Sequence, residues 1–136
     1  MAGQFVNGNP PSRGLAMLFV LVSAIPVSAQ DEGYEELQGA AITALSERRI
    51  DEAVELLERC LLARPEDAAS AYNLACASAR QARPDEAFPW LERALVWGFR
   101  DGGLLHTDAD LSSLFGDKRW VAIQEHSPGY ALCHEC

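Results

Sequence analysis

The sequence is poor in positive charge. Its 136 residues include 11 Lys and Arg against 20 Asp and Glu, which gives a formal net charge of −9. A surface this acidic repels the phosphate groups of nucleic acids and the anionic head groups of membranes. We therefore expect no nucleic-acid partner and no attraction to an anionic membrane surface.

The sequence also lacks an apolar run long enough to span a membrane. The longest run covers residues 15–25, whereas a spanning helix needs about 20 apolar residues. Arg13 precedes this run, Pro26 interrupts it, and small residues follow. This order is typical of a secretory signal peptide, with a buried helix of the domain as the alternative. We predict a signal peptide at residues 1–29, cleavage near Ala29, and an exported protein that is periplasmic or secreted and has no stable membrane span.

Motifs of common catalytic sites are missing as well. No glycine-rich phosphate loop is present, and no serine lies in a nucleophile-elbow motif or is tied to a histidine–acid pair. The acidic pairs Asp51-Glu52 and Asp85-Glu86 fall in the first turns of predicted helices, where the helix dipole favours negative charge. We therefore expect a protein that is not an enzyme and that needs no cofactor.

What the sequence does contain is an internal repeat with a period of 34 residues, because residues 34–67 align with residues 68–101. The identical positions cluster in two blocks. These blocks are Arg49-x-Asp51-Glu52-Ala53 with Arg83-x-Asp85-Glu86-Ala87, and Leu57-Glu58-Arg59-x-Leu61 with Leu91-Glu92-Arg93-x-Leu95. A period of 34 residues with helical spacing is typical of a helix–turn–helix solenoid unit.

Apolar residues in each copy recur at the spacing of helix faces. In the first copy one such series starts at Tyr34 and a second starts at Ile50, and Pro65 ends the second helix. The breaks between helices are only a few residues long, so the two helices of each copy should pack antiparallel. Small residues are expected where these helices cross, and they are Ala41, Ala53, Ala75 and Ala87.

Several of these positions carry a family resemblance. They are Leu37, Ala41, Ala53, Leu57, Pro65, Leu74, Ala75, Ala87, Leu91 and Ala94. Over about residues 34–125 the chain resembles a tetratricopeptide-repeat protein. Its second half is similar to the end-of-group variant of that repeat, through Tyr72-Asn73-Leu74-Ala75-Cys76, Asp85-Glu86-Ala87, Gly98-Phe99-Arg100 and Leu105-x-x-Asp108-x-Asp110-Leu111. The resemblance implies an all-α array of helix hairpins that holds partner peptides or domains without catalysis.

The period fails after the second copy, and residues 104–126 are predicted to form a helical cap over the open end. Thr107 with Asp110 predicts the start of a short helix there. His106, Asp108 and Asp110 are ligand-type residues at alternate positions. Helix capping is the favoured interpretation, because a calcium loop would need more oxygen ligands.

The expected fold class is all-α, with antiparallel helix hairpins in two tetratricopeptide-like repeats and a C-terminal helical cap, preceded by the signal peptide. The helical domain spans residues 30–126, and a tail follows at residues 127–136. The exposed end of the repeats leaves a surface through which an oligomer could form.

In such an array the first helix of each pair is expected to line the concave face. The residues predicted to line a partner-binding groove there are Gln38, Ile42, Tyr72, Asn73, Cys76 and Arg80. Tyr72 is either an apolar anchor or a packed side chain, and Asn73 offers an amide to a peptide backbone. Arg80 is the one cation among them, so a clamp for a C-terminal carboxylate is not expected. The predicted function is non-catalytic binding of a neutral or basic protein or peptide.

The sequence has four cysteines. Cys60 and Cys76 lie on packing faces of predicted helices and are expected to be buried free thiols, with a disulfide between them as the alternative. Cys133 and Cys136 form a C-x-x-C pair that could close a disulfide. With His134 the pair is also a weak candidate for a metal site, since thiolate and imidazole suit zinc. The alternative function is therefore a metal-binding or redox-linked envelope protein that uses this pair.

Overall fold

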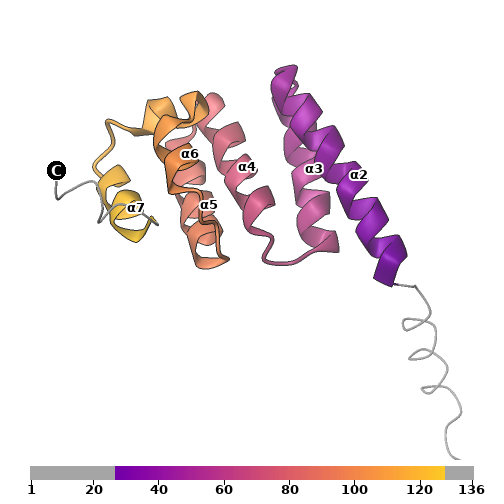
Figure 1. Cartoon of the computed structure of the whole chain (residues 1–136). Helices are drawn as coiled ribbons and strands as arrows, with labels where there is room; N and C mark the ends of the chain where they lie inside the picture. The colour runs from indigo at the N-terminus through magenta and orange to yellow at the C-terminus, as the bar shows by residue number, and fades with distance from the viewer. Residues whose placement is uncertain (1–26, 128–136) are drawn as a thin grey trace, which may run out of the picture. The chain divides into compact units, whose positions relative to one another are not determined.

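The computed structural model describes residues 27–127, with side chains from Gly33 onward, and these residues form helices without a strand (Figure 1). The elements are α2 (Val27–Ser46), α3 (Ile50–Ala63), α4 (Ala68–Arg80), α5 (Pro84–Val96), α6 (Gly102–Thr107), the 3₁₀ helix η1 (Ala109–Leu114) and α7 (Trp120–His126). The predicted all-α class is confirmed for the described residues.

The predicted signal peptide lies almost wholly outside the described residues, and so does the tail beyond Ser127. Contacts divide the chain into a unit of residues Met1–Glu32 and a second unit of residues Gly33–Cys136. The cores and surfaces of the described helices belong to the second unit. None of the described helices is both long enough and apolar enough to cross a membrane.

α4 lies at the centre of the second unit. It packs against α3, α5 and η1, and α5 also contacts α7 (Figure 1). A first core joins α2, α3 and α4, and its buried residues are Ala41, Ala44, Leu45, Ala53, Leu57, Leu74 and Ala77. A second core joins α4 and α5 to the C-terminal helices, and its larger buried side chains include Phe88, Leu91, Leu105, Leu111, Leu114 and Trp120. Trp90 packs against both cores.

The alanines expected at the helix crossings are all fully buried. Ala41, Ala53, Ala75 and Ala87 are each 0% exposed. A larger side chain at any of these positions would force the neighbouring helix away, because the interior is close-packed.

The turn between α2 and α3 contains a residue in the left-handed region. The amide of Arg49 donates to the carbonyl of Ala44 at 2.8 Å, and the amide of Arg48 donates to that of Leu45 at 3.1 Å. Arg48 has a φ of 62°. This is a Schellman cap, which satisfies carbonyls that a helix otherwise leaves unpaired at its end.

The turn between α4 and α5 repeats the same cap at the period of the sequence. Arg83 donates to the carbonyl of Ser78 and Ala82 donates to that of Ala79, both at 3.0 Å. Ala82, with a φ of 56°, takes the place that Arg48 has in the earlier turn. A third cap of this kind ends α5 and has a glycine, Gly98, at a φ of 104°.

Polar contacts join residues about one repeat apart. Arg80 Nη1 donates to the carbonyl of Leu45 at 2.6 Å, and Ser113 Oγ donates to the carbonyl of Ala79 at 3.3 Å. Both acceptors lie in the last turn of a helix, and each also accepts the amide hydrogen bond of its Schellman cap. Further links are Glu35–Arg64, Asp51–Gln81, Tyr34–Asp67, Asp85–Arg119 and Tyr72–Asp108, and together these pairs are 29 to 36 positions apart.

The helical structure is interrupted at Asp108, which lies between α6 and η1. The backbone of Asp108 is extended, and its Oδ1 accepts a hydrogen bond from the amide of Asp110 at 2.9 Å, so Asp108 is the N-cap of η1. The prediction that Thr107 starts this helix is wrong, because its hydroxyl donates to the carbonyl of Gly103 within α6. The favoured interpretation of Asp108 as a capping residue is confirmed.

Candidate functional site

Tyr72 lies beneath the C-terminal helices. It is 4% exposed, and its ring stacks on that of Phe99 with the centroids 4.2 Å apart. Its hydroxyl donates to Oδ2 of Asp108 at 2.7 Å. Burial raises the pKa of Tyr72 well above its usual range, so the hydroxyl remains protonated and keeps donating.

Cys76 shares the acceptor of Tyr72. It is 2% exposed, and its Sγ donates to Oδ2 of Asp108 at 3.7 Å. Burial, together with the nearby carboxylates of Asp108 and Asp110, raises the pKa of this thiol. The thiol is therefore a weak hydrogen-bond donor at neutral pH and not a thiolate.

Ligand-type atoms of Cys76, Asp108 and Asp110 lie within 4.8 Å of one another, which is close enough to surround a metal ion. Donors from the protein already occupy this cluster. Tyr72 and Cys76 both bind Asp108, and the guanidinium of Arg80 pairs with Asp110 at 2.7 Å. A metal at this cluster would have to displace these donors from both carboxylates.

Two other residues of the predicted groove also bind within the protein. Besides its ion pair with Asp110, Arg80 donates to the carbonyl of Leu45 at the end of α2. Gln38 donates from Nε2 to the hydroxyl oxygen of Tyr34 at 2.9 Å. Arg80 therefore joins α4 to the end of α2, whereas the hydrogen bond of Gln38 lies within α2.

Four of the predicted groove residues keep exposed surface, and of these Ile42 and Asn73 form no side-chain hydrogen bond within the described part of the chain. Ile42 on α2 is 51% exposed, and Asn73 on α4 is partly exposed. The prediction that Tyr72 and Cys76 face a partner needs correction, because the chain after α5 covers both side chains. Helical spacing could not show this, since their shared acceptor Asp108 lies 36 and 32 positions further along the chain.

Cys60 and Cys76 are free and buried, as the sequence predicts. Burial raises the pKa of the Cys60 thiol as it does that of Cys76, so neither is an activated nucleophile. Cys133, His134 and Cys136 lie outside the described residues. The disulfide, the metal site and the redox role suggested for them stay predictions.

A groove between α3 and α5 gathers acidic side chains, and we call it the acidic groove. Its volume is about 270 Å³, and two buried residues of α4, Leu74 and Ser78, form its floor. Its lining residues are Asp51, Val54, Glu55, Glu58, Leu74, Ser78, Gln81, Arg83, Glu86 and Trp90. Four carboxylates against one guanidinium leave this lining with a formal charge of −3.

Two of the four carboxylates have donors inside the acidic groove. Asp51 Oδ1 accepts a hydrogen bond from Gln81 Nε2 at 2.8 Å, which joins the start of α3 to the α4–α5 turn. Glu86 pairs with Arg83 at 3.6 Å on the surface of α5. These contacts neutralise one carboxylate and leave the single cation of the groove already engaged.

Asp51, Glu55 and Glu58 carry the remaining negative charge of the acidic groove, and Glu55 and Glu58 are the two without a donor. Within the described part of the chain neither forms an ion pair. Trp90 lines the groove from α5, and the guanidinium carbon of Arg93 lies 4.5 Å from the centroid of its ring. Two unpaired carboxylates and an indole that already attracts a cation favour a cationic ligand.

The sequence analysis missed the acidic groove, although part of its signal was present. Asp51, Glu55 and Glu58 are spaced i, i+4 and i+7, which puts them on one face of α3. That spacing alone is equally typical of a solvated helix face. The distinguishing feature is Trp90 on α5, whose place beside these acids depends on how α3 and α5 pack on α4.

Protein-family models, curated proteins and solved structures were compared with the chain, and none matches it. The chemistry of its own surfaces therefore carries any functional assignment.

Proposed function

We propose that this chain is a non-catalytic protein-interaction module that binds a basic segment of a partner protein in the acidic groove. The observation that carries the proposal is the unpaired Glu55 and Glu58 together with Trp90 in one groove. Carboxylates attract Lys and Arg side chains, and the face of an indole binds the same cations.

The proposal includes a repeat architecture of the tetratricopeptide type. In it α2 with α3 and α4 with α5 form two antiparallel hairpins, and α6, η1 and α7 cap the end. Support comes from the equivalent Schellman caps at Arg48 and Ala82 and from the fully buried alanines of the helix crossings. We include export in the proposal, so that the partner is met in the periplasm or outside the cell.

Electrostatics sets the expected strength of binding. Exposed ion pairs contribute up to about 1 kcal/mol each. Removing the charges of both Glu55 and Glu58 should therefore cost about 1.4 kcal/mol, which is tenfold in affinity. Since the Debye length shrinks from about 10 Å at 0.1 M salt to about 3 Å at 1 M, binding should also weaken as salt rises.

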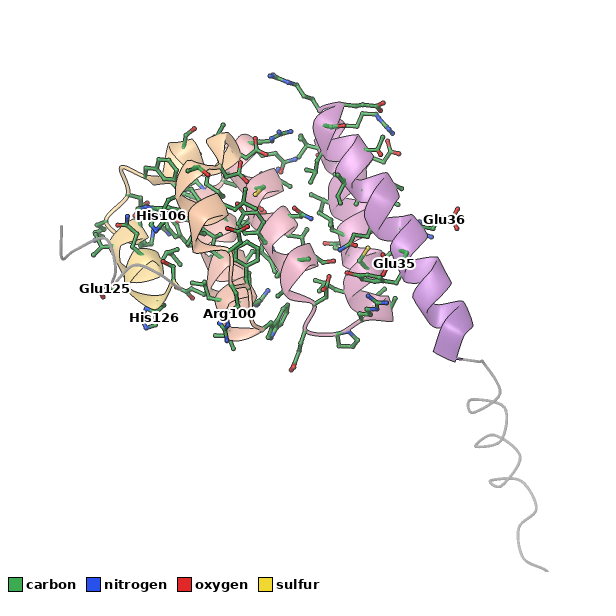
Figure 2. All side chains as sticks on the ribbon, in the orientation of Figure 1. Glu35, Glu36, Arg100, His106, Glu125 and His126 are labelled. Carbon is green, nitrogen blue, oxygen red and sulfur yellow. The ribbon has the colours of Figure 1, made fainter. Side chains whose placement is uncertain are left out.

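The test is a calorimetric titration of the purified chain with an extended peptide rich in Arg and Lys. The double variant Glu55→Gln/Glu58→Gln should bind about tenfold more weakly. The matched control Glu36→Gln/Glu125→Gln removes the same charge from α2 and α7, which do not line the groove (Figure 2). The control should bind within about twofold of the unchanged chain. Equal weakening by both variants would show attraction to net charge alone and would overturn the proposal.

A further variant separates the acidic groove from the surface that the sequence predicted. Ile42→Ser combined with Asn73→Ala changes two accessible residues of the α2–α4 face and should leave the affinity for the peptide unchanged. If this variant loses binding while Glu55→Gln/Glu58→Gln keeps it, the partner site lies on the α2–α4 face.

A further inference from the structure

A second hollow, between α5 and α7, is mainly apolar, and we call it the α5–α7 hollow. Its volume is about 440 Å³, which lies within the usual range of small-ligand pockets. Its lining residues are Glu92, Leu95, Val96, Ala122, Ile123 and His126. The hollow shares no lining residue with the acidic groove, so it is a separate surface.

The apolar part of the hollow comes from one face of each helix. The lining positions are spaced i, i+3 and i+4 on α5, and they are spaced i, i+1 and i+4 on α7. Leu95 and Ile123 belong to the second core, whereas Val96 is 81% exposed. The hollow therefore offers a ligand apolar contact with both helices, part of which water now covers.

The two polar groups of the hollow are both hydrogen-bond acceptors. Glu92 is exposed, and its carboxylate forms no ion pair or hydrogen bond within the described part of the chain. Nδ1 of His126 lies 2.7 Å from the carbonyl oxygen of Ala122. Because a carbonyl only accepts, Nδ1 carries the proton, and Nε2 of the neutral ring is left as an acceptor. A fitting ligand therefore brings a donor, and the charge of Glu92 favours a cationic one.

We propose that the α5–α7 hollow binds a small organic amine. The apolar body of the amine rests on Leu95, Val96 and Ile123, and its ammonium group pairs with Glu92. The net charge of −9 disfavours an apolar ligand with a carboxylate head. A second copy of the chain is disfavoured too, because both copies carry this charge and a two-fold interface would bring two copies of Glu92 into one apolar contact.

The test is a titration of the full chain, with isotope-labelled methyl groups, by cyclohexylmethylammonium chloride. We expect saturable shifts of the methyl signals of Leu95, Val96 and Ile123. Cyclohexylmethanol has the same apolar body without the charge, so it should bind about fivefold more weakly. Equal dissociation constants for the amine and the alcohol would overturn the proposal. Shifts of the Trp90 signals without shifts at these methyl groups would place the amine in the acidic groove and would also overturn it.

Matched variants test the ion pair. Glu92→Gln should weaken binding of the amine about fivefold and leave binding of the alcohol unchanged. The control Glu125→Gln removes the same charge from a residue of α7 that does not line the hollow (Figure 2). It should bind the amine within about twofold of the unchanged chain. Equal weakening by both variants would show attraction to net charge alone and would contradict a role for Glu92.

A substitution in the apolar part tests the seat of the ligand body. Val96→Ser should weaken binding of both the amine and the alcohol about fourfold, the ratio expected for one buried methylene group. Leu62→Ser is the matched control, since Leu62 is an apolar side chain on α3 that is 82% exposed, and it should change neither. Unchanged binding in Val96→Ser would contradict the proposed seat. Methyl shifts in the hollow that depend on protein concentration before amine is added would show a second copy there instead.

Discussion

Three helix ends have a residue in the left-handed region, and only one of these residues is glycine. Gly98 adopts this conformation readily, whereas Arg48 and Ala82 carry a Cβ that opposes it. The penalty for an ordinary residue is about 1–2 kcal/mol. The two repeat turns therefore keep a local backbone cost that the packing of α2 on α3 and of α4 on α5 outweighs.

Exchanging the residue types at these turns should change stability in opposite directions. Ala82→Gly removes the Cβ that opposes the left-handed backbone conformation. It should raise the free energy of unfolding by about 0.5–1 kcal/mol, after the added chain entropy of glycine is subtracted. Gly98→Ala should lower it by about 1 kcal/mol. Because nothing lies within 4 Å of a Cβ added at Gly98, that loss would come from the backbone alone. Urea unfolding curves measure both changes.

Gly116→Ala is the control for this pair. Its added Cβ also meets open space, and its backbone is not left-handed, so it should not destabilise the protein. A neutral Gly98→Ala would contradict the explanation.

Single residues also show what sequence patterns can and cannot predict. The burial of Cys60 and Cys76 as free thiols followed from their helical spacing, because an apolar stripe identifies the face that packs. The burial of Tyr72 did not follow, because the side chains that cover it come from later in the chain. A period of 3.6 residues describes the face of one helix and contains nothing about Asp108 or Phe99.

At the scale of helices, an aspartate joins one helix to the next in two places. Asp67 caps α4 by accepting from the amide of Ser70 at 2.9 Å, and it also accepts from the hydroxyl of Tyr34 at 2.7 Å. Asp108 caps η1 and accepts from the hydroxyl of Tyr72 at the same distance. In both places the cap of one helix is bound to a tyrosine of an earlier helix.

Loss of Asp108 should therefore cost more than loss of a cap. Asp108→Ala removes the acceptor of the Asp110 amide and leaves the buried hydroxyl of Tyr72 without a partner. We expect a loss of about 2–4 kcal/mol, from about 1 kcal/mol for the cap and about 1–3 kcal/mol for the unsatisfied donor. Tyr72→Phe should cost only about 1 kcal/mol, because it leaves no donor unpaired. Denaturant unfolding of both variants measures this difference. A loss in Asp108→Ala no larger than that of an ordinary cap would show that the Tyr72 bond contributes nothing.

The sequence predicted some helices correctly but not the division of the chain at the Asp108 cap. The helices around residues 50–63 and 84–96 were expected from amphipathic periodicity, and the structure has them as α3 and α5. The division of the following stretch into α6 and η1 was not expected. It depends on Asp108 serving as a cap and as an acceptor for Tyr72 at once, and the second role exists only in the folded chain.

For the molecule as a whole, we expect low pH to reduce the free energy of unfolding. Two hydrogen bonds from the guanidinium of Arg119 and one from its amide hold Asp117 and lower its pKa to about 2. Burial alone would raise the pKa of Asp67, but hydrogen bonds from Ser70 and Tyr34 outweigh it and lower that pKa. Both carboxylates are thus more acidic when the protein is folded.

The sign of the pH dependence follows from these shifts. A carboxylate with a lowered folded pKa stabilises fully above its unfolded pKa of about 3.9 and loses that contribution as pH falls through the folded value. The melting temperature should therefore decline between pH about 4 and about 2. Asp117→Asn should make this decline shallower, whereas Glu36→Gln, on the exposed surface of α2, should not change it. An identical decline in Asp117→Asn would contradict the role of Asp117. Calorimetric melting at several pH values measures the slopes.

The polar links between residues 29 to 36 positions apart have a consequence for how the protein assembles. Each of these links closes a loop of similar, modest length. The entropic cost of loop closure is therefore small and nearly the same for each link. Each new helix packs against residues that were synthesised shortly before it. A nascent polypeptide can thus add structure progressively from its N-terminal side, with only the newest segment awaiting neighbours.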